Sequence, residues 1–355
     1  MTGALYGPEG FFTRPAEGPA DHFRTSVHAS PLFAGALLRL IREVDAALGH
    51  PGTLDVVDMG AGRGELLTAL HALLDADPAD ELAGRVRFAG IEMVARPTGL
   101  PADIHWQRYA PEQVTGVLLA TEWLDNVPLA VAEVDPRGRS RRVLVDPGTG
   151  EETLGADVDA ADRFWLARWW PGARPGDRME IGWPRDVAWA DAVATVRRGC
   201  ALAIDYGHLR SARPPLGTLT GYRDGRQVPP RPDGSTDVTA HVAVDSAAAA
   251  AGTAYRIIGQ RAALRALGVD GGRPPLELAR TDPAAYLRAL SSAGAAAELT
   301  DPAGLGGHWW LLHEVGINLR GTMTGMTDCT EPRPARAGDD RTGEGHEGMP
   351  KVSTA

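Results

Sequence analysis

The residues from Leu54 to Leu74 combine a short apolar run, a glycine-rich turn and a second apolar pattern with helical spacing. The apolar run ends at Asp58, and Gly60, Gly62 and Gly64 follow at every second position. Glycine lets the backbone pass very close to a ligand, and the helix after the turn begins with N–H groups that have no partner within the helix. We therefore expect this strand, turn and helix to hold a nucleoside-type cofactor.

One residue beside the turn, Glu65, indicates which cofactor is bound. In the dinucleotide fingerprint G-x-G-x-x-G, the pyrophosphate lies at the N-terminus of the helix. Glu65 stands here where the fingerprint has its third glycine, and its carboxylate would repel a pyrophosphate. S-adenosyl-L-methionine (SAM) has no phosphate and carries a cationic sulfonium and an ammonium group. The pattern D-x-G-x-G-x-G also resembles motif I of class I SAM-dependent methyltransferases, which favours SAM over the alternative of an NAD-dependent dehydrogenase.

Acidic residues follow two further apolar segments that we expect to be strands. Glu92 comes after a strand predicted over 85–91, and Glu122 and Asp125 come after a strand predicted over 117–120. In open α/β sheets ligands lie at the carboxyl ends of the strands, so Glu92 could accept both ribose hydroxyls of an adenosine. Glu122 and Asp125 could neutralise a cationic substrate such as a guanidinium, or remove its proton. The alternative is a solvated acidic pair at a helix start, where the helix dipole favours negative charge.

The elements that must position these residues alternate between strand and helix. An amphipathic helix predicted over 31–48, with Ser30 as its N-cap, precedes the strand that ends at Asp58. The alternation predicts an α/β protein with a Rossmann-like sheet. Its expected parts are an N-terminal lid over 1–30, too irregular for a helix, a SAM-binding core over 31–146, an inserted subdomain or cap over 147–178, the rest of the core over 179–319, and a disordered tail over 320–355.

The composition excludes several classes of function. The chain has 355 residues, of which 43% are hydrophobic, and a formal net charge of −10, which argues against non-specific nucleic-acid binding. Its two cysteines exclude a disulfide framework and a cysteine-based zinc site, and the spacing of His308 and His313 does not match a zinc-binding helix, so no metal is predicted. No apolar run is long enough to span a membrane, and we expect a cytoplasmic protein that does not bind membranes.

Five segments of the chain resemble the MidA-like SAM-dependent methyltransferases, a family that includes the mitochondrial complex I assembly factor 7. They occur in the family's order: Asp21–Ser26, Val57–Leu66, Ala120–Pro128, Glu180 with Ala201–Gly207, and Gly217–Arg223 with Asp237–Val242. The last two are more specific than the glycine turn, which any class I methyltransferase can carry. The N-terminal segment departs from the family, because Thr25-Ser26-Val27-His28 replaces the family's T-A-P-E.

The resemblance implies a class I methyltransferase fold with an inserted subdomain, SAM as cofactor, and methyl transfer to a protein arginine. The residues that it places at the cofactor are Thr25, Asp58, Gly60, Ala61, Gly62, Gly64, Glu92 and Thr121. It places Glu122 and Asp125 near the transferred methyl group, as candidate catalytic residues. Two alternatives stay open: a small-molecule methyltransferase of a biosynthetic pathway, and a non-catalytic assembly protein with a methyltransferase fold.

Overall fold

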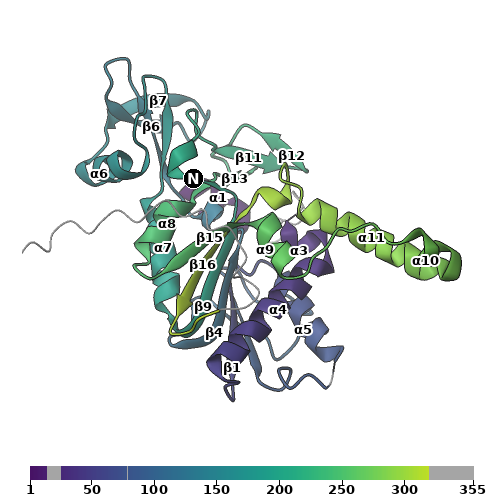
Figure 1. The fold of residues 1–355 in the computed structure, drawn as a ribbon. Coiled ribbons are helices and arrows are strands. Elements are labelled where there is room, and N and C mark those ends of the chain that lie inside the picture. The colour runs from purple at the N-terminus through teal and green to yellow at the C-terminus, as the bar shows by residue number, and fades with distance from the viewer. Residues whose placement is uncertain (14–24, 78, 320–355) are drawn as a thin grey trace, which may run out of the picture.

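A seven-stranded sheet forms the centre of the computed structural model, which describes residues 1–13, 25–77 and 79–319 (Figure 1). The strand order is β15-β16-β9-β4-β1-β2-β3, with β16 antiparallel to both neighbours and every other pair parallel. The strands are β1 (Leu54–Met59), β2 (Val86–Ile91), β3 (His105–Gln107), β4 (Val114–Thr121), β9 (Val196–Asp205), β15 (Tyr255–Gly259) and β16 (Trp309–Val315). The strand order reverses between β1 and β4, as in doubly wound sheets. The predicted α/β class with a Rossmann-like sheet is therefore confirmed.

Helices cover both faces of this sheet. One face carries α4 (Pro31–Leu48), α5 (Glu65–Asp75) and α9 (Gln260–Ala266), and the other carries α7 (Trp183–Ala194) and α8 (Val244–Ala250). In β4, Val117 and Leu119 pack in the same core as Phe33 of α4, whereas Leu118 and Ala120 pack in the core that contains Trp189 of α7. Side chains alternate along a strand, so burial on both faces explains the continuous apolar run of β4.

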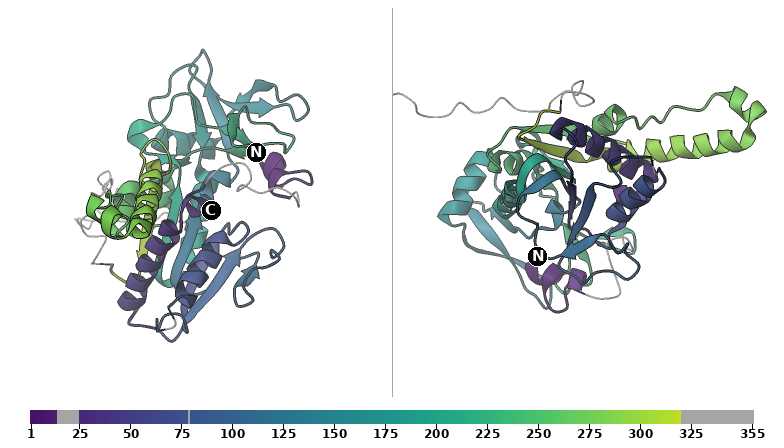
Figure 2. Two further views of the ribbon diagram at one scale, coloured as in Figure 1. Left: turned by 90° about the vertical axis from the view of Figure 1, so that its right-hand side faces the viewer. Right: turned by 90° about the horizontal axis from the view of Figure 1, so that it is seen from below.

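Two further helices extend away from the sheet, as Figure 1 and the right view of Figure 2 show. They are α10 (Leu276–Thr281) and α11 (Pro283–Leu299). The buried residues of α11 are Ala296 and Leu299, near its C-terminus, where the 3-10 helix η4 (Leu305–Gly307) follows. The anchoring of α11 to the sheet is therefore confined to one end of the helix.

The segment between β4 and α7 forms a second, antiparallel sheet with the order β7-β6-β5-β8. Its elements are β5 (Ala130–Val134), β6 (Ser140–Val145), β7 (Glu152–Asp157), α6 (Ala160–Trp169) and β8 (Arg178–Ile181). Val134, Trp165, Trp170 and Ile181 belong to its own buried cluster. The predicted insertion boundary at 147 falls between β6 and β7, so this sheet takes strands from both sides of it.

The described part of the N-terminal segment contains short helices, so the expectation that it is too irregular for a helix was wrong. They are α1 (Thr2–Tyr6), η1 (Phe11–Thr13) and α3 (Ser26–Ala29). Leu5 and Phe11 pack against Val238 of a third sheet, with the order β12-β11-β13. Helices this short are unstable alone, and these are held by tertiary packing that no local pattern shows.

The third sheet and its surroundings consist of short elements. They are η2 (Leu124–Asn126), β10 (Gly207–His208), η3 (Arg210–Ala212), β11 (Thr220–Arg223), β12 (Arg226–Val228), β13 (Asp237–Thr239) and β14 (Val242–Ala243). In Figure 1, α1 lies beside β13, above the carboxyl ends of the central strands. These elements therefore border the edge of the sheet where ligands bind in doubly wound folds.

A buried arginine of α7 joins several of these elements. The side chain of Arg185 is almost fully buried, at 1% exposure. Its guanidinium donates hydrogen bonds to the carbonyl oxygens of Val127 at 3.0 Å, Ala240 at 2.8 Å and His241 at 3.0 Å, and also to that of Asp125. Arg185 therefore holds the loop after β4 against the loop after β13.

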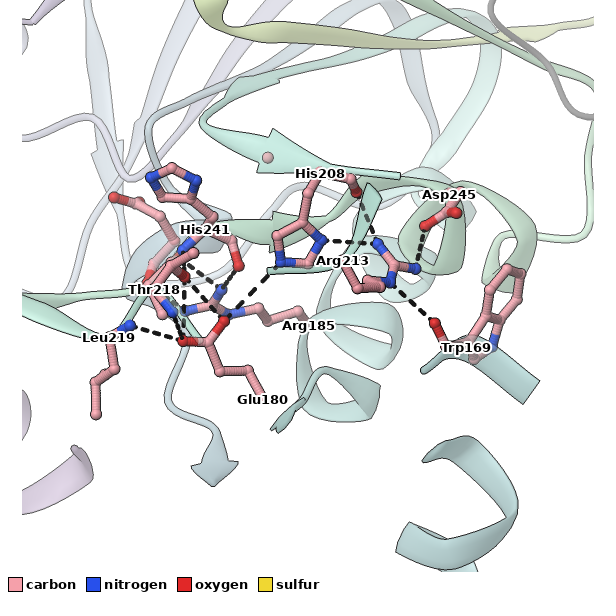
Figure 3. Close-up of polar contacts among 12 residues, drawn as sticks. Trp169, Glu180, Arg185, His208, Arg213, Thr218, Leu219, His241 and Asp245 are labelled. Atoms are coloured by element: carbon pink, nitrogen blue, oxygen red, sulfur yellow. Dashed lines mark hydrogen bonds and ion pairs between the residues drawn. The ribbon is translucent and has the colours of Figure 1, made fainter. Parts of the chain in front are cut away.

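A second polar network connects the insertion to the segment before β11 and to the loop after β13, as Figure 3 shows. The carboxylate of Glu180 in β8 accepts hydrogen bonds from the backbone N–H groups of Thr218 at 2.5 Å and Leu219 at 2.7 Å. The hydroxyl of Thr218 bonds to Glu180 Oε2 at 2.8 Å and accepts a bond from the N–H of His241 at 2.8 Å. The family signatures around Glu180, Thr218 and His241 thus have a structural role, because they dock the insertion onto the core.

Replacing Arg185 by methionine should destabilise the protein. The variant keeps the volume of the side chain and leaves the carbonyls of four residues without their donor, so we expect the free energy of unfolding to fall by about 3–5 kcal/mol. Urea denaturation followed by circular dichroism measures the change. Arg288→Met, at an exposed position on α11, is the control and should stay within about 0.5 kcal/mol of the wild type. Equal stability of the two variants would contradict the role given to Arg185.

Candidate functional site

The loops that follow β1, β2 and β4 meet at the carboxyl ends of the strands, where the strand order reverses. They comprise residues 60–64, 92–94 and 121–127, and the segment 25–29 lies against them. This is the position at which doubly wound sheets bind their ligands. The structure thus brings together three sequence segments that were singled out separately.

The glycine turn adopts a backbone conformation that favours glycine at three positions. Gly60, Gly62 and Gly64 have φ angles of 69°, 58° and 80°. A Cβ atom added at Gly60 would lie 2.5 Å from the Trp123 side chain, and one added at Gly64 would lie 2.5 Å from the Leu100 side chain. The turn therefore requires glycine for its left-handed backbone and, at two positions, also for close packing.

Glu65 covers the N-terminus of α5. Its Oε2 accepts a hydrogen bond from the N–H of Arg63 at 2.9 Å, and its Oε1 lies 3.4 Å from Nε2 of His28. The protein's own carboxylate therefore occupies the region in which a dinucleotide would place its pyrophosphate. This geometry agrees with the argument that excluded a dinucleotide.

Two further acids face the turn. Oε2 of the half-buried Glu92 accepts a hydrogen bond from the N–H of Gly62 at 3.1 Å, and its Oε1 accepts one from the N–H of Met93 at 2.6 Å. Asp58 is buried at the end of β1, and burial, together with the charges of Glu65 and Glu92, raises its pKa to about 8.

Backbone hydrogen bonds hold the glycine turn beside Glu92. The N–H groups of Gly60 and Ala61, which follow β1, both donate to the carbonyl oxygen of Ile91 at the end of β2, at 2.9 and 3.2 Å.

The segment that contains Thr25 contacts both sides of the site. The hydroxyl of Thr25 bonds to Nδ1 of His28 at 2.6 Å, and His28 in turn contacts Glu65. The N–H of Ser26 donates to Oε1 of Glu122 at 3.0 Å. Thr25 and Ser26 therefore connect the glycine turn with the loop after β4.

Glu122 combines a strained backbone with a buried side chain. Its φ is 52°, which is uncommon for a residue other than glycine, and its side chain is 4% exposed. Among the described residues, its Oε2 and the hydroxyl of the neighbouring Thr121 are buried and have no hydrogen-bond partner. Burial raises the pKa of Glu122 to about 8. Backbone strain and unpaired buried groups often occur together at functional sites.

His308 lies behind Glu122. Its Nε2 is 3.8 Å from Oε1 of Glu122, and its Nδ1 lies 2.5 Å from the carbonyl of Leu305. Burial lowers the pKa of His308 to about 4, so the imidazole is neutral, and with Nδ1 as the donor, Nε2 carries a lone pair. His313 lies within β16, and its Nδ1 is 2.9 Å from the hydroxyl of Thr253. Within the described ranges, no group of three or more His, Cys, Asp or Glu side chains could hold a metal ion.

Asp125 lies in the same loop, but its carboxylate is already engaged. The side chain is 1% exposed, and it accepts hydrogen bonds from the hydroxyl of Thr239 at 2.7 Å and from the amide of Asn126 at 3.0 Å. Its N–H donates to Oδ2 of Asp205 at 3.2 Å, and its carbonyl accepts from Arg185. Of the two predicted catalytic acids, Glu122 has the unpaired carboxyl oxygen.

Two further buried acids lie close to these loops, and neither was given a role from the sequence although both belong to the family signatures. Asp205 ends β9 and accepts hydrogen bonds from the N–H groups of Leu124 at 2.9 Å and Asp125 at 3.2 Å. It follows an apolar strand just as Glu92 does, so the same rule could have identified it. Asp237 begins β13 and is fully buried. Asp237 belongs to the signature Asp237–Val242, but its nearness to the loop after β4 depends on the third sheet and could not be read from the sequence.

The stability of the cofactor-free protein should fall between pH 7 and pH 8. Burial raises the pKa values of Asp58, Glu122 and Asp237 to about 8, whereas carboxyl groups of an unfolded chain titrate near pH 4. The folded protein therefore keeps protons that the unfolded chain has released, and the stability gained at lower pH is lost as the pH rises toward 8. Urea denaturation at several pH values tests this.

Asp58→Asn is the matched variant for this measurement. It should make the slope shallower by up to about 1.4 kcal/mol per pH unit, since it removes one such proton. A stability that stays constant or rises over this interval would show that the buried acids are ionised in the folded protein.

Residues 36–259 match the model of a family described as putative S-adenosyl-L-methionine-dependent methyltransferases. No curated protein matches the chain. Within the described residues, no helix is long and apolar enough to cross a membrane.

Two crystal structures from Burkholderia thailandensis, of proteins from one superfamily, resemble the chain over most of its length. One is described as a likely methyl transferase bound to S-adenosyl-homocysteine; it has 25% sequence identity and a TM-score of 0.75, with 92% of this chain and 89% of that chain covered. The other is a native structure of an uncharacterized protein, with 26% identity, a TM-score of 0.70, and coverage of 89% and 86%. The family match, over residues 36–259, includes the loops after β1, β2 and β4.

Proposed function

Because the chain belongs to this family of putative SAM-dependent methyltransferases, we propose that it transfers a methyl group from SAM to the arginine side chain of a protein. The family match and the two structural relatives confirm the predicted MidA-like family, the SAM-dependent methyltransferase activity and SAM as the cofactor. We propose the acceptor and the roles of individual residues from the contacts of the site.

The cofactor side of the site comprises the predicted binding residues. Gly60, Ala61, Gly62 and Gly64 would line the cofactor, since their backbone turns beside the carboxyl end of β1. Glu92 would accept the ribose hydroxyls, and its anchoring by the N–H of Gly62 orients its carboxylate at the turn. Asp58 near the end of β1, Thr121 at the end of β4 and Thr25 before α3 would complete the cofactor side.

Glu92→Gln should weaken SAM binding about tenfold, because it replaces charge-assisted hydrogen bonds to the ribose by neutral ones. Isothermal titration with SAM measures the affinity. Glu112→Gln, at an exposed position before β4, is the control and should bind SAM as the wild type does. If both variants bind equally well, Glu92 does not hold the ribose.

The observation that carries the arginine proposal is the unpaired carboxyl oxygen of Glu122 at the end of β4. When bound, SAM supplies a methyl group already activated on a sulfonium. An acceptor nitrogen attacks this methyl carbon, the C–S bond breaks with its electron pair left on sulfur, and the nitrogen loses a proton. Glu122 would hold the guanidinium by charge-assisted hydrogen bonds and take this proton. Asp125, tied to Thr239 and Asn126, would keep the loop in shape.

Glu122→Gln should lower the rate of methyl transfer about 100-fold, the usual contribution of a positioned acid or base. We would incubate the protein with cell extract and SAM labelled in the methyl group, and identify the product after acid hydrolysis. Labelled methylarginine in a protein band, lost in the variant, supports the proposal. Label in a small-molecule fraction would replace it by the small-molecule alternative. No incorporation despite SAM binding would favour the non-catalytic assembly protein.

A further inference from the structure

Asp237 lies on the face of β13 that points toward the loop after β4, where Glu122 would bind the methyl acceptor. In the pairing of β13 with β11, Asp237 is opposite Tyr222. Side chains alternate along a strand, so Asp237 and Thr239 share one face and Val238 the other. Thr239 reaches Asp125 at 2.7 Å, whereas Val238 packs in the cluster of α1. Asp237 is therefore directed toward the loop after β4.

The carboxyl group of Asp237 is buried without a partner. The residue is 0% exposed, and neither carboxyl oxygen has a hydrogen bond in the described part of the chain. A buried polar group without a partner costs about 1–3 kcal/mol, so its presence needs an explanation. The loop after β4, toward which Asp237 is directed, contains three more unpaired oxygens, those of Thr121, Glu122 and Asn126. Such a set of unpaired acceptors is suited to a ligand that donates several hydrogen bonds.

The surrounding charges favour a cationic ligand. The charges of Asp125 and Asp237 raise the pKa of Glu122, after the larger effect of burial, so these acids are close enough to interact. The guanidinium of Arg185 is occupied by main-chain carbonyls and does not bond to Asp237. The hydroxyl of Tyr6 bonds to the carbonyl of Asn126 at 3.1 Å, which places α1 beside this group. The site thus contains more acids than bases.

We propose that Asp237 is the second carboxylate of the acceptor site, and that it binds the guanidinium of the incoming arginine together with Glu122. This inference rests on the proposed function and identifies the residue that selects a cationic acceptor over a neutral one. A guanidinium has five N–H donors in a fixed plane, so one carboxylate cannot satisfy it, whereas two can bond to different edges. Glu122 follows β4 and Asp237 begins β13, so the two approach from different elements.

Binding of two small probes tests this inference without knowledge of the natural acceptor. The first is N-acetyl-arginine N-methylamide. The second is the corresponding citrulline compound, which has nearly the same shape but a neutral urea group. Both are titrated into protein saturated with S-adenosyl-homocysteine, and binding is followed by saturation-transfer NMR. The wild type should prefer the arginine probe at least about tenfold, as expected for charge-assisted hydrogen bonds.

Asp237→Asn should reduce this preference about tenfold and leave the affinity for S-adenosyl-homocysteine unchanged. Asp186→Asn is the matched control, because Asp186 is also a buried carboxyl but bonds to Trp165 and Ser246 beneath the insertion. It should keep the wild-type preference. Asp237→Ser is a second variant, in case the amide disturbs packing.

The outcomes separate the inference from the proposed function. A wild-type preference retained in both Asp237 variants overturns the inference and leaves the arginine proposal standing. A wild type that binds both probes equally overturns the arginine proposal and the inference with it. Loss of S-adenosyl-homocysteine binding in both variants means that Asp237 supports the fold instead of the acceptor, and this also overturns the inference.

Discussion

The arrangement of the site depends on the buried guanidinium of Arg185. Removing a charge from water costs several kcal/mol, and here four main-chain carbonyls and the negative charges of nearby acids offset that cost. The carbonyls belong to Asp125, Val127, Ala240 and His241. One side chain of α7 therefore sets the distance between the loop after β4 and the loop after β13. The hydrogen bond from Thr239 to Asp125 joins β13 to the same loop after β4.

The two sides of the site differ in their chemistry. On the proposed cofactor side, the positive φ angles of the glycine turn bring the backbone close to the carboxyl end of β1, and Glu92 is anchored to that backbone. On the proposed acceptor side, the groups are side-chain acids: both carboxyl oxygens of Asp125 accept hydrogen bonds, whereas one oxygen of Glu122 is unpaired. Burial raises the pKa of Glu122 to about 8, so without a cation the group keeps its proton at neutral pH. A cation would favour the ionised form, which couples ligand binding to proton release.

Features encoded by short segments could be predicted well. The helix from Pro31 to Leu48 begins at Ser30, whose hydroxyl accepts a hydrogen bond from the N–H of Leu32. The glycine turn could be predicted because the spacing of residues within a strand and a turn is set locally, and Glu92 does lie beside it, bonded to the N–H of Gly62. The short helix α1 was missed, since Leu5 is buried only through its contact with Val238. Propensity and periodicity do not report contacts between segments so far apart in the chain.

The amino-acid sequence alone indicated the glycine turn and argued against a dinucleotide, since both depend on residues within one strand–turn–helix unit, and the alternation of strands and helices indicated the α/β class. Its longer signatures also indicated the family. The tertiary structure was needed to show which carboxyl oxygens of these acids have hydrogen-bond partners and which have none. Asp125 and Glu122 look alike in the sequence, yet the hydroxyl of Thr239, more than a hundred residues further on, donates a hydrogen bond to the carboxylate of Asp125. Asp237 gained a candidate role in the same way, because strand pairing and burial bring distant side chains together, and its signature segment did not indicate which residues it would meet.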